Sequence, residues 1–178
     1  VSELLLTYPF LSNIDIAEIK SEKRKLEILS VNALLVSMTG YEGVCLRHGD
    51  DGAPCLEGYH ISISHTRGYA AIILSRNYCV GIDVEYASDR VGRIKAKFIR
   101  PDEDFNDIQS LLVNWSAKET VYKLRHSEKL DYFDMRLHQF LSGAKGMVMV
   151  DDLKKGDFVE VNYRRTDEYV VTYSVEYC

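Results

Sequence analysis

The sequence predicts a protein of the mixed α+β class. Apolar residues recur at helical spacing in two long segments, 21–38 and 111–124. After Phe140 the pattern changes, and apolar and polar residues alternate with a period of two, as in half-buried strands. Helical and strand segments therefore follow one another along a short chain, which is typical of the α+β class.

Composition limits the function classes that need to be considered. A chain of 178 residues fits one domain or two small fused halves. The net charge of −5 argues against nucleic acid as a partner. No run of about 18 apolar residues is present, so we expect no membrane-spanning helix. The sequence begins at Val1 rather than Met, which leaves open a removed leader or missing N-terminal residues.

Cysteine usage bears on the cellular compartment. Four cysteines are present and no two of them form a CxxC pair. This pattern predicts reduced, mostly buried thiols in a cytoplasmic protein. The four residues are Cys45, Cys55, Cys79 and Cys178.

The first half of the chain predicts one helix followed by two strands. Ser21–Met38 reads as a helix that Thr39-Gly40 ends, with Leu26, Leu29, Ala33 and Val36 forming its apolar stripe. Residues 41–58 are rich in loop-forming residues. The segment 60–74 then predicts two strands that are broken near Arg67-Gly68.

The second half predicts one more strand, several helical segments and a strand-rich tail. Tyr78–Glu85 reads as a strand, and Leu111–Leu124 reads as a helix. Arg90–Phe98 is expected to be helical, and Pro101-Asp102-Glu103 resembles a helix start. The tail strands are expected around 147–149, 159–163 and 169–175, with turns at Gly143, Gly146 and Gly156.

A pair of carboxylates lies in the strand segment Gly81–Glu85. Side chains alternate along a strand, so Asp83 and Glu85 share one face. Two carboxylates held this close repel each other unless one is protonated or a cation lies between them. Oxygen ligands suit Mg²⁺. The competing interpretation is a solvated acidic strand face.

A second group of polar residues lies on the predicted helix Leu111–Leu124. Trp115, Glu119 and Lys123 are spaced i, i+4, i+8 and share one helix face. This arrangement would place a carboxylate and an ammonium group together for a metal and a phosphate. Two simpler interpretations remain open. Ser116-x-x-Glu119 matches a capping box, and Glu119 with Lys123 matches an i,i+4 ion pair.

Two further segments offer candidates for phosphate binding. The alternating segment Ile61–Thr66 delivers Ser64 and His65 at the end of a strand, where a histidine can donate to a phosphate or transfer a proton. A purely structural histidine is the alternative, and no GxSxG motif supports a serine hydrolase. The basic run 20–25, which includes Arg24 and Lys25, could receive a phosphate at a helix start or form a solvated face.

The order of these segments resembles the 4′-phosphopantetheinyl transferase superfamily. Ser64-His65, then Gly81-Ile82-Asp83-Val84-Glu85, then Trp115-Ser116-Ala117-Lys118-Glu119 with Tyr122-Lys123, is similar to the family pattern G-[IV]-D-[IVL]-E and W-[ST]-x-K-E-x-x-x-K. The larger, pseudodimeric, surfactin-synthetase-activating type is the closer match. The likeness covers roughly residues 21–123.

The resemblance implies roles for the matching residues. Asp83, Glu85 and Glu119 would be ligands of Mg²⁺, and Lys123 would contact the pyrophosphate of coenzyme A. Ser64 and His65 would bind its adenosine phosphates, and Asp83, Glu119 and Lys123 would form the catalytic set. Relatives often carry Gly-Lys-Pro where this chain has Gly52-Ala53-Pro54. Arg24 and Lys25 are the best substitutes for the basic residues that relatives place upstream, while the role of Lys118 stays open.

The resemblance also implies an activity and an architecture. The chain would be a holo-[acyl-carrier-protein] synthase that transfers 4′-phosphopantetheine from coenzyme A to a serine of an apo acyl or peptidyl carrier protein and releases 3′,5′-ADP. Two similar α/β halves, residues 1–80 and 81–178, would be related by a pseudo-twofold axis, each with a small, mainly antiparallel sheet and a long helix. A cytoplasmic monomer without nucleic-acid or membrane partners is expected. The loop after Arg100 or the segment Leu124–Phe133 would dock the carrier.

Two alternatives remain. A degenerate family member would bind coenzyme A or a protein partner without transferring the arm. A metal-dependent phosphohydrolase or nuclease would use the same carboxylates. The acidic net charge of −5 counts against the nuclease.

Overall fold

The chain has two compact units, which the computed structural model describes over all residues, Val1–Cys178. The first unit comprises Val1–Tyr59 and the second His60–Cys178. The division predicted from the sequence, 1–80 and 81–178, concerns two repeated halves and stays a prediction. The boundary between the compact units lies elsewhere in the sequence, between Tyr59 and His60, because the strands after His60 pack within the second unit.

The first unit is built around one long helix. Its elements are α1 (Ser2–Thr7), a 3₁₀ turn (Pro9–Asn13), α2 (Glu22–Thr39) and the short pair β1 (Arg47–His48) and β2 (Pro54–Cys55). Ser21 caps α2 by accepting from the amide of Arg24, and Gly40 ends it in the left-handed conformation. The predicted helix end is thus confirmed. Leu29 and Ala33 are buried as expected, whereas Leu26 is 43% exposed.

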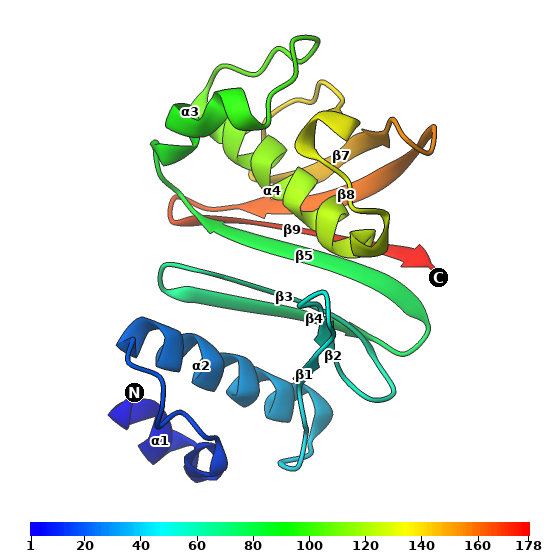
Figure 1. Cartoon of the computed structure of the whole chain (residues 1–178). Coiled ribbons are helices and arrows are strands. Elements are labelled where there is room, and N and C mark those ends of the chain that lie inside the picture. The colour runs from blue at the N-terminus through cyan, green and yellow to red at the C-terminus, as the bar shows by residue number, and fades with distance from the viewer. The chain divides into compact units, whose positions relative to one another are not determined.

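The second unit contains a hairpin and a larger antiparallel sheet. The hairpin consists of β3 (His60–Thr66) and β4 (Tyr69–Ser75), and its turn at Arg67-Gly68 is where the sequence predicted the break. Strands β5 (Tyr78–Tyr86), β9 (Tyr169–Tyr177), β8 (Asp157–Arg165), β7 (Lys145–Asp152) and β6 (Met135–Leu137) form the sheet in that spatial order. Figure 1 shows the hairpin beside β5. The α+β class is therefore confirmed.

Helix α4 (Ile108–Leu124) covers one face of this sheet. The main core lies between them and includes Val113, Ala117 and Val121 from the helix. The shorter helix α3 (Arg90–Ile94) and a 3₁₀ turn (Lys95–Lys97) fill most of the predicted helical segment 90–98. Two further 3₁₀ turns (His126–Glu128 and Tyr132–Asp134) follow α4. None of the helices is both long and apolar enough to cross a membrane.

Two predictions are wrong. Pro101-Asp102-Glu103 does not start a helix, because Glu103 accepts instead from the amides of Arg100 and Leu137. The cysteines are not the reduced, mostly buried thiols that the sequence predicted. Cys79 and Cys178 form a disulfide, and Cys45 and Cys55 are exposed. The end of β9 lies beside the start of β5 in the sheet, which brings the two bonded cysteines together.

Candidate active site

The candidate site begins on β5, whose central residues are buried on both faces. Asp83 is only 3% exposed and Glu85 is half-buried. The interpretation of a solvated acidic strand face is therefore wrong for Asp83. A carboxylate is costly to bury without partners. The burial of Asp83 therefore depends on the hydrogen bonds and the ion pair that it makes.

Gly81 sets the distance between β5 and α4. A Cβ atom on Gly81 would lie 2.4 Å from the carbonyl oxygen of Thr120 and 2.9 Å from Cβ of Leu124. Only glycine permits this approach. The first residue of the Gly81–Glu85 motif therefore brings the helix close to the strand that carries the carboxylates.

Helix α4 presents Trp115, Glu119 and Lys123 toward β5. The position of its first residue also tests the capping-box interpretation. Asp107 caps the helix by accepting from the amides of Gln109 and Ser110. Ser116 therefore lies in the middle of α4, and the capping-box interpretation of Ser116 and Glu119 is wrong. The Ser116 hydroxyl instead donates to Oδ2 of Asp83 at 2.8 Å.

Asp83 collects donors from three directions. Ser64 on β3 donates to Oδ1 at 2.8 Å, and the ammonium group of Lys123 lies 2.7 Å from the same oxygen. Lys123 also donates to the carbonyl of Ile82 at 3.2 Å. The expected ion pair of Lys123 with Glu119 is replaced by this pair with Asp83, which spans from helix to strand.

Glu85 accepts two hydrogen bonds, and its pKa is raised. Nε1 of Trp115 donates to Oε1 at 2.9 Å, and the Thr66 hydroxyl donates to Oε2 at 3.3 Å. Burial raises the pKa of Glu85, and the negative charge of Asp83 raises it further. The Trp115 hydrogen bond opposes this rise. The carboxylate thus lies in a setting that resists negative charge.

Glu119 is in a similar state. The Tyr132 hydroxyl donates to its Oε1, while burial and the charges of Asp83 and Glu85 raise the pKa of Glu119. The pKa of Tyr132 is also raised, first by burial and then by the hydrogen bond to Glu119. Sequence reasoning missed Tyr132 because no spacing relates it to Glu119. Its ring packs on Trp115 with centroids 5.0 Å apart.

The three carboxylates suit a hard divalent cation in chemistry and charge. The charge of Asp83 raises the pKa of Glu85, and the charges of Asp83 and Glu85 both raise the pKa of Glu119, so a cation would relieve repulsion within the group. Oxygen ligands of this kind are those that Mg²⁺ prefers. Their spacing is wider than in a compact metal cluster. Only His60, Cys79 and Cys178 bring three ligand atoms within 4.8 Å of one another. Side-chain rotation would have to bring the carboxylates onto one small ion.

Ser64 and His65 separate on β3 because neighbouring strand residues face opposite sides. Ser64 is buried and contacts Asp83, whereas His65 is exposed. Ser62, Ser64 and Thr66 share one face of β3. Ser62 accepts from the amide of Ile82 on β5, whereas Ser64 and Thr66 donate to Asp83 and Glu85. These side-chain contacts form what we call the β3–β5 seam. The structure brings Ser64, but not His65, to the carboxylates.

Arg24 and Lys25 lie in the first unit, at the start of α2. Lys25 pairs with Glu22 at 2.8 Å and Arg24 with Glu27 at 3.2 Å. These pairs are typical of a solvated helix face. Gly52-Ala53-Pro54 also belongs to the first unit, where the carbonyl of Ala53 accepts from the amide of Gly49 in a turn.

Lys118, whose role the sequence left open, is fully buried. Its ammonium group donates to the carbonyl of Phe98 at 2.7 Å and to Glu103 at 2.8 Å. Desolvation lowers the pKa of Lys118, and the pairing with Glu103 opposes this. Lys118 therefore fixes the loop before α4 instead of facing the carboxylates.

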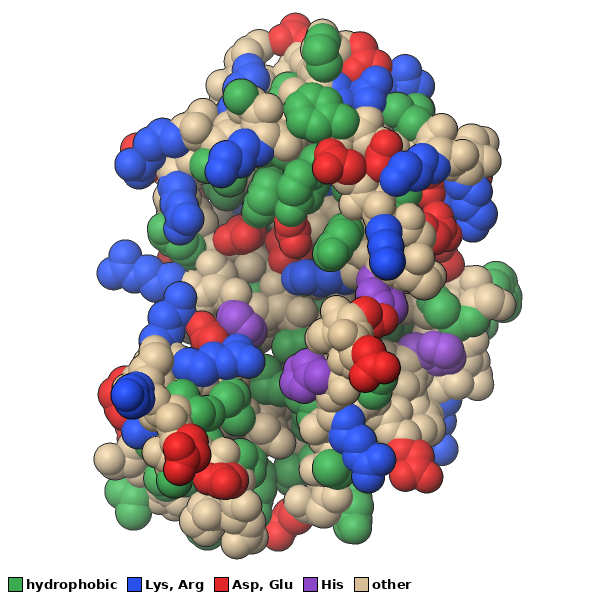
Figure 2. Space-filling model, in the orientation of Figure 1, with side chains coloured by type: hydrophobic (Ala, Val, Ile, Leu, Met, Phe, Trp, Pro, Cys, Tyr) green, Lys and Arg blue, Asp and Glu red, His purple; other side chains and the backbone are tan.

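The surface view adds the charge pattern around these elements. On the face shown in Figure 2, acidic and basic side chains are interspersed over the second unit rather than gathered by sign. The carboxylates of β5 and α4 described above thus lie close to one another, whereas the surface charges of this face are mixed in sign.

Comparison with known proteins adds no relative. No protein-family model matches the chain, and no curated protein sequence matches it. The resemblance to the 4′-phosphopantetheinyl transferases therefore rests on the sequence motifs in β3, β5 and α4.

Proposed function

We propose that this protein transfers the 4′-phosphopantetheine arm of coenzyme A to a serine of an apo acyl or peptidyl carrier protein, with Mg²⁺ as cofactor. The observation that carries the proposal is the convergence of Asp83 and Glu85 from β5 with Glu119 and Lys123 from α4. These residues stand in the order of the family pattern. Supporting contacts come from Ser64, Ser116 and Trp115.

The reaction requires the serine Oγ to attack the β-phosphorus of coenzyme A. A P–O bond in the diphosphate breaks, and 3′,5′-ADP leaves. A bound Mg²⁺ ion supplies positive charge against the diphosphate. Asp83, Glu85 and Glu119 would hold that ion.

The remaining steps fall to two side chains of α4. Glu119 has a raised pKa, which favours its acceptance of the proton from the serine hydroxyl. Its Oε1 accepts from the Tyr132 hydroxyl, so Oε2 is the oxygen that would take the proton or hold the ion. Lys123 brings an ammonium group to the carboxylates and would neutralise charge on the departing phosphate.

Coenzyme A would extend from this centre toward Ser64 and His65. Ser64 lies against Asp83, so it would act near the diphosphate, while the exposed His65 would act at the nucleotide end. Arg24 and Lys25 stay predicted phosphate ligands, and within their own unit they pair with Glu27 and Glu22. The finer architecture, two related halves at 1–80 and 81–178 in a cytoplasmic monomer, belongs to this proposal.

One hydrogen bond joins the two segments expected to dock a carrier. The guanidinium group of Arg100 donates to the carbonyl of Phe133, which joins the loop after Arg100 to the end of the segment Leu124–Phe133. The Phe133 side chain is 41% exposed. We propose that the carrier contacts both segments, where an apolar ring lies close to Tyr132 and thus to Glu119.

Intact-mass measurement of apo carriers tests the function directly. Carriers from fatty-acid, polyketide and peptide synthesis would be incubated with the protein, coenzyme A and Mg²⁺. We expect one carrier to gain the mass of one phosphopantetheine group. Asp83→Asn should abolish the gain because it removes the charge that both Lys123 and a metal require. Glu160→Gln, which changes an exposed acid on β8, should leave it intact.

Other outcomes would support the alternatives. The Lys123–Asp83 ion pair satisfies Asp83 without a metal, as a degenerate member that binds without transfer would require. Calorimetric binding of coenzyme A with no mass gain on any carrier would favour that alternative. Release of phosphate or nucleotide without a carrier would indicate a phosphohydrolase. Equal transfer by Asp83→Asn and the unchanged protein would exclude the proposed centre.

A further inference from the structure

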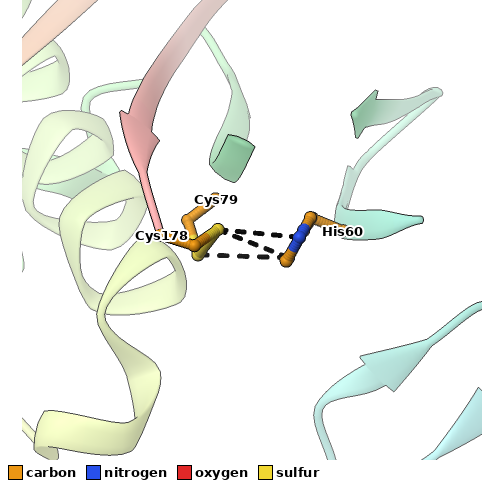
Figure 3. Close-up of side chains that lie close together, drawn as sticks. All are labelled: His60, Cys79 and Cys178. Atoms are coloured by element: carbon orange, nitrogen blue, oxygen red, sulfur yellow. Dashed lines mark hydrogen bonds between the residues drawn. A yellow bond between two sulfur atoms is a disulfide. The ribbon is translucent and has the colours of Figure 1, made fainter. Parts of the chain in front are cut away.

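A second group of metal-ligating side chains lies at the other end of β5. His60, Cys79 and Cys178 bring one ligand atom each within 4.8 Å of one another. Figure 3 shows the imidazole of His60 facing the two sulfur atoms. Nδ1 and Nε2 of His60 each lie 3.6 Å from Sγ of Cys178, and Nδ1 lies 4.0 Å from Sγ of Cys79. Nothing in the proposed transfer uses these residues.

The fold brings the three residues together from distant parts of the sequence. His60 begins β3, Cys79 is the second residue of β5, and Cys178 follows β9. The antiparallel register pairs Cys79 with Glu176 and Tyr78 with Tyr177, so the end of β9 lies beside the start of β5. His60 and Cys178 are exposed and Cys79 is half-buried, so an ion can reach the group from solvent.

We propose that His60, Cys79 and Cys178 bind one Zn²⁺ ion when the disulfide is reduced. Reduction by a phosphine or dithiol adds two electrons and two protons to the disulfide, which becomes two thiols as the reductant is oxidised. Binding of Zn²⁺ then releases both protons, because thiolates are the ligands. Disulfide and zinc site exclude each other, since each uses the same two sulfur atoms.

The observed distances match a tetrahedral zinc centre. With Zn–S near 2.3 Å and Zn–N near 2.0–2.1 Å, tetrahedral angles place ligand sulfur and nitrogen roughly 3.6 Å apart. The separation of His60 from Cys178 is 3.6 Å, and that from Cys79 is 4.0 Å. Nδ1 and Nε2 lie at equal distances from Sγ of Cys178, so the imidazole must turn to point one nitrogen at the ion. The sulfur atoms, roughly 3.8 Å apart in such a centre, must separate when their bond is reduced.

The ligand types select zinc over magnesium. Thiolate and imidazole are ligands that Zn²⁺ prefers, whereas Mg²⁺ prefers oxygen. Three protein ligands leave a fourth position, which water can fill at this exposed group. The group is distinct from the carboxylate centre, because Cys79 and Asp83 are four residues apart on β5, about 13 Å along the strand.

The test uses the full chain in which Cys45→Ser and Cys55→Ser remove the two exposed free thiols. After reduction with a phosphine and removal of the reductant, zinc would be titrated against a chromophoric chelator. We expect one zinc ion per reduced chain and none per oxidised chain. Co²⁺ should give thiolate charge-transfer absorption and tetrahedral visible bands in the reduced chain alone.

Single variants assign the ligands. His60→Ala, Cys79→Ser and Cys178→Ser in the same background should each weaken zinc binding by more than the roughly 10–100-fold that loss of an outer partner costs. In the reduced, unsubstituted chain, zinc should protect Cys79 and Cys178, but not Cys45 and Cys55, from alkylation, as read by peptide mass mapping. This second measurement holds even if a variant fails to fold. Absent zinc binding by the reduced chain, or equal alkylation of all four cysteines with zinc, would overturn the proposal.

Discussion

Replacing Gly81 with alanine tests whether the spacing of β5 and α4 depends on this glycine. The added Cβ would lie 2.4 Å from the carbonyl oxygen of Thr120, about 1 Å short of the 3.4 Å at which ordinary contact begins. A helix backbone cannot rotate away as a side chain can, so α4 must shift. Overpacking of this kind costs about 1–3 kcal/mol, and alanine regains about 0.5–1 kcal/mol of strand stability relative to glycine.

With overpacking at the middle of its range, about 2 kcal/mol, the net destabilisation is about 1–1.5 kcal/mol. For a chain of this length it should lower Tm by about 2–6 °C in thermal unfolding followed by circular dichroism. The same shift would displace Glu119 and Lys123 from Asp83. If the proposed transfer is correct, a displacement of about 1 Å lowers its rate by roughly a hundredfold.

Gly143→Ala is the matched control for this substitution. Its added Cβ would meet its nearest neighbours at 3.6 and 3.9 Å, which is ordinary contact. We expect a change within about 0.5 kcal/mol. If Gly81→Ala unfolds at the same temperature as Gly143→Ala, the close approach of α4 to β5 does not constrain this position, and our account of the motif fails.

Two further predictions concern charge. The pKa values of Glu85 and Glu119 are raised above 4.5, so the folded state binds more protons, and stability should fall as pH rises from that value through the raised ones. Mg²⁺ should therefore raise Tm by a larger amount at a pH well above these pKa values than at a pH near 4.5. An increase in Tm that does not depend on pH, or that persists in Asp83→Asn, would contradict the metal assignment. Lys118→Met should cost about 3–5 kcal/mol in chemical denaturation because it leaves Glu103 buried without its cation. Lys25→Met removes a pair of the same 2.8 Å length whose carboxylate, Glu22, is open to solvent, and it should cost far less because water screens that pair. Comparable losses would show that burial does not set the value of the pair.

Local patterns predicted the elements that carry the candidate site. Alternation identified β3 and β5, and helical periodicity identified α4, because each pattern reflects the packing of that element against its neighbours. The end of α2 was also predicted, since Gly40 adopts the left-handed conformation that the end of a helix favours.

The failures arose where a distant residue overrides a local preference. Pro101-Asp102-Glu103 has the composition of a helix start, but Glu103 is bound by Lys118 and by the amide of Leu137. Ser116 and Glu119 match a capping box, yet the helix had already begun at Ile108. The contacts of Tyr132 with Glu119 and of Cys79 with Cys178 depend on the tertiary arrangement, which no local spacing encodes.

The β3–β5 seam makes hairpin attachment and charge at the carboxylates one coupled equilibrium. Two of its three hydroxyl groups, those of Ser64 and Thr66, donate to oxygens of Asp83 and Glu85 that a bound cation would also contact. Only the Ser62 hydroxyl is anchored on a backbone amide. A cation that binds the carboxylates would therefore weaken the attachment of the hairpin at its Thr66 end. By thermodynamic reciprocity, a change that strengthens this attachment would lower the affinity of the carboxylates for the cation.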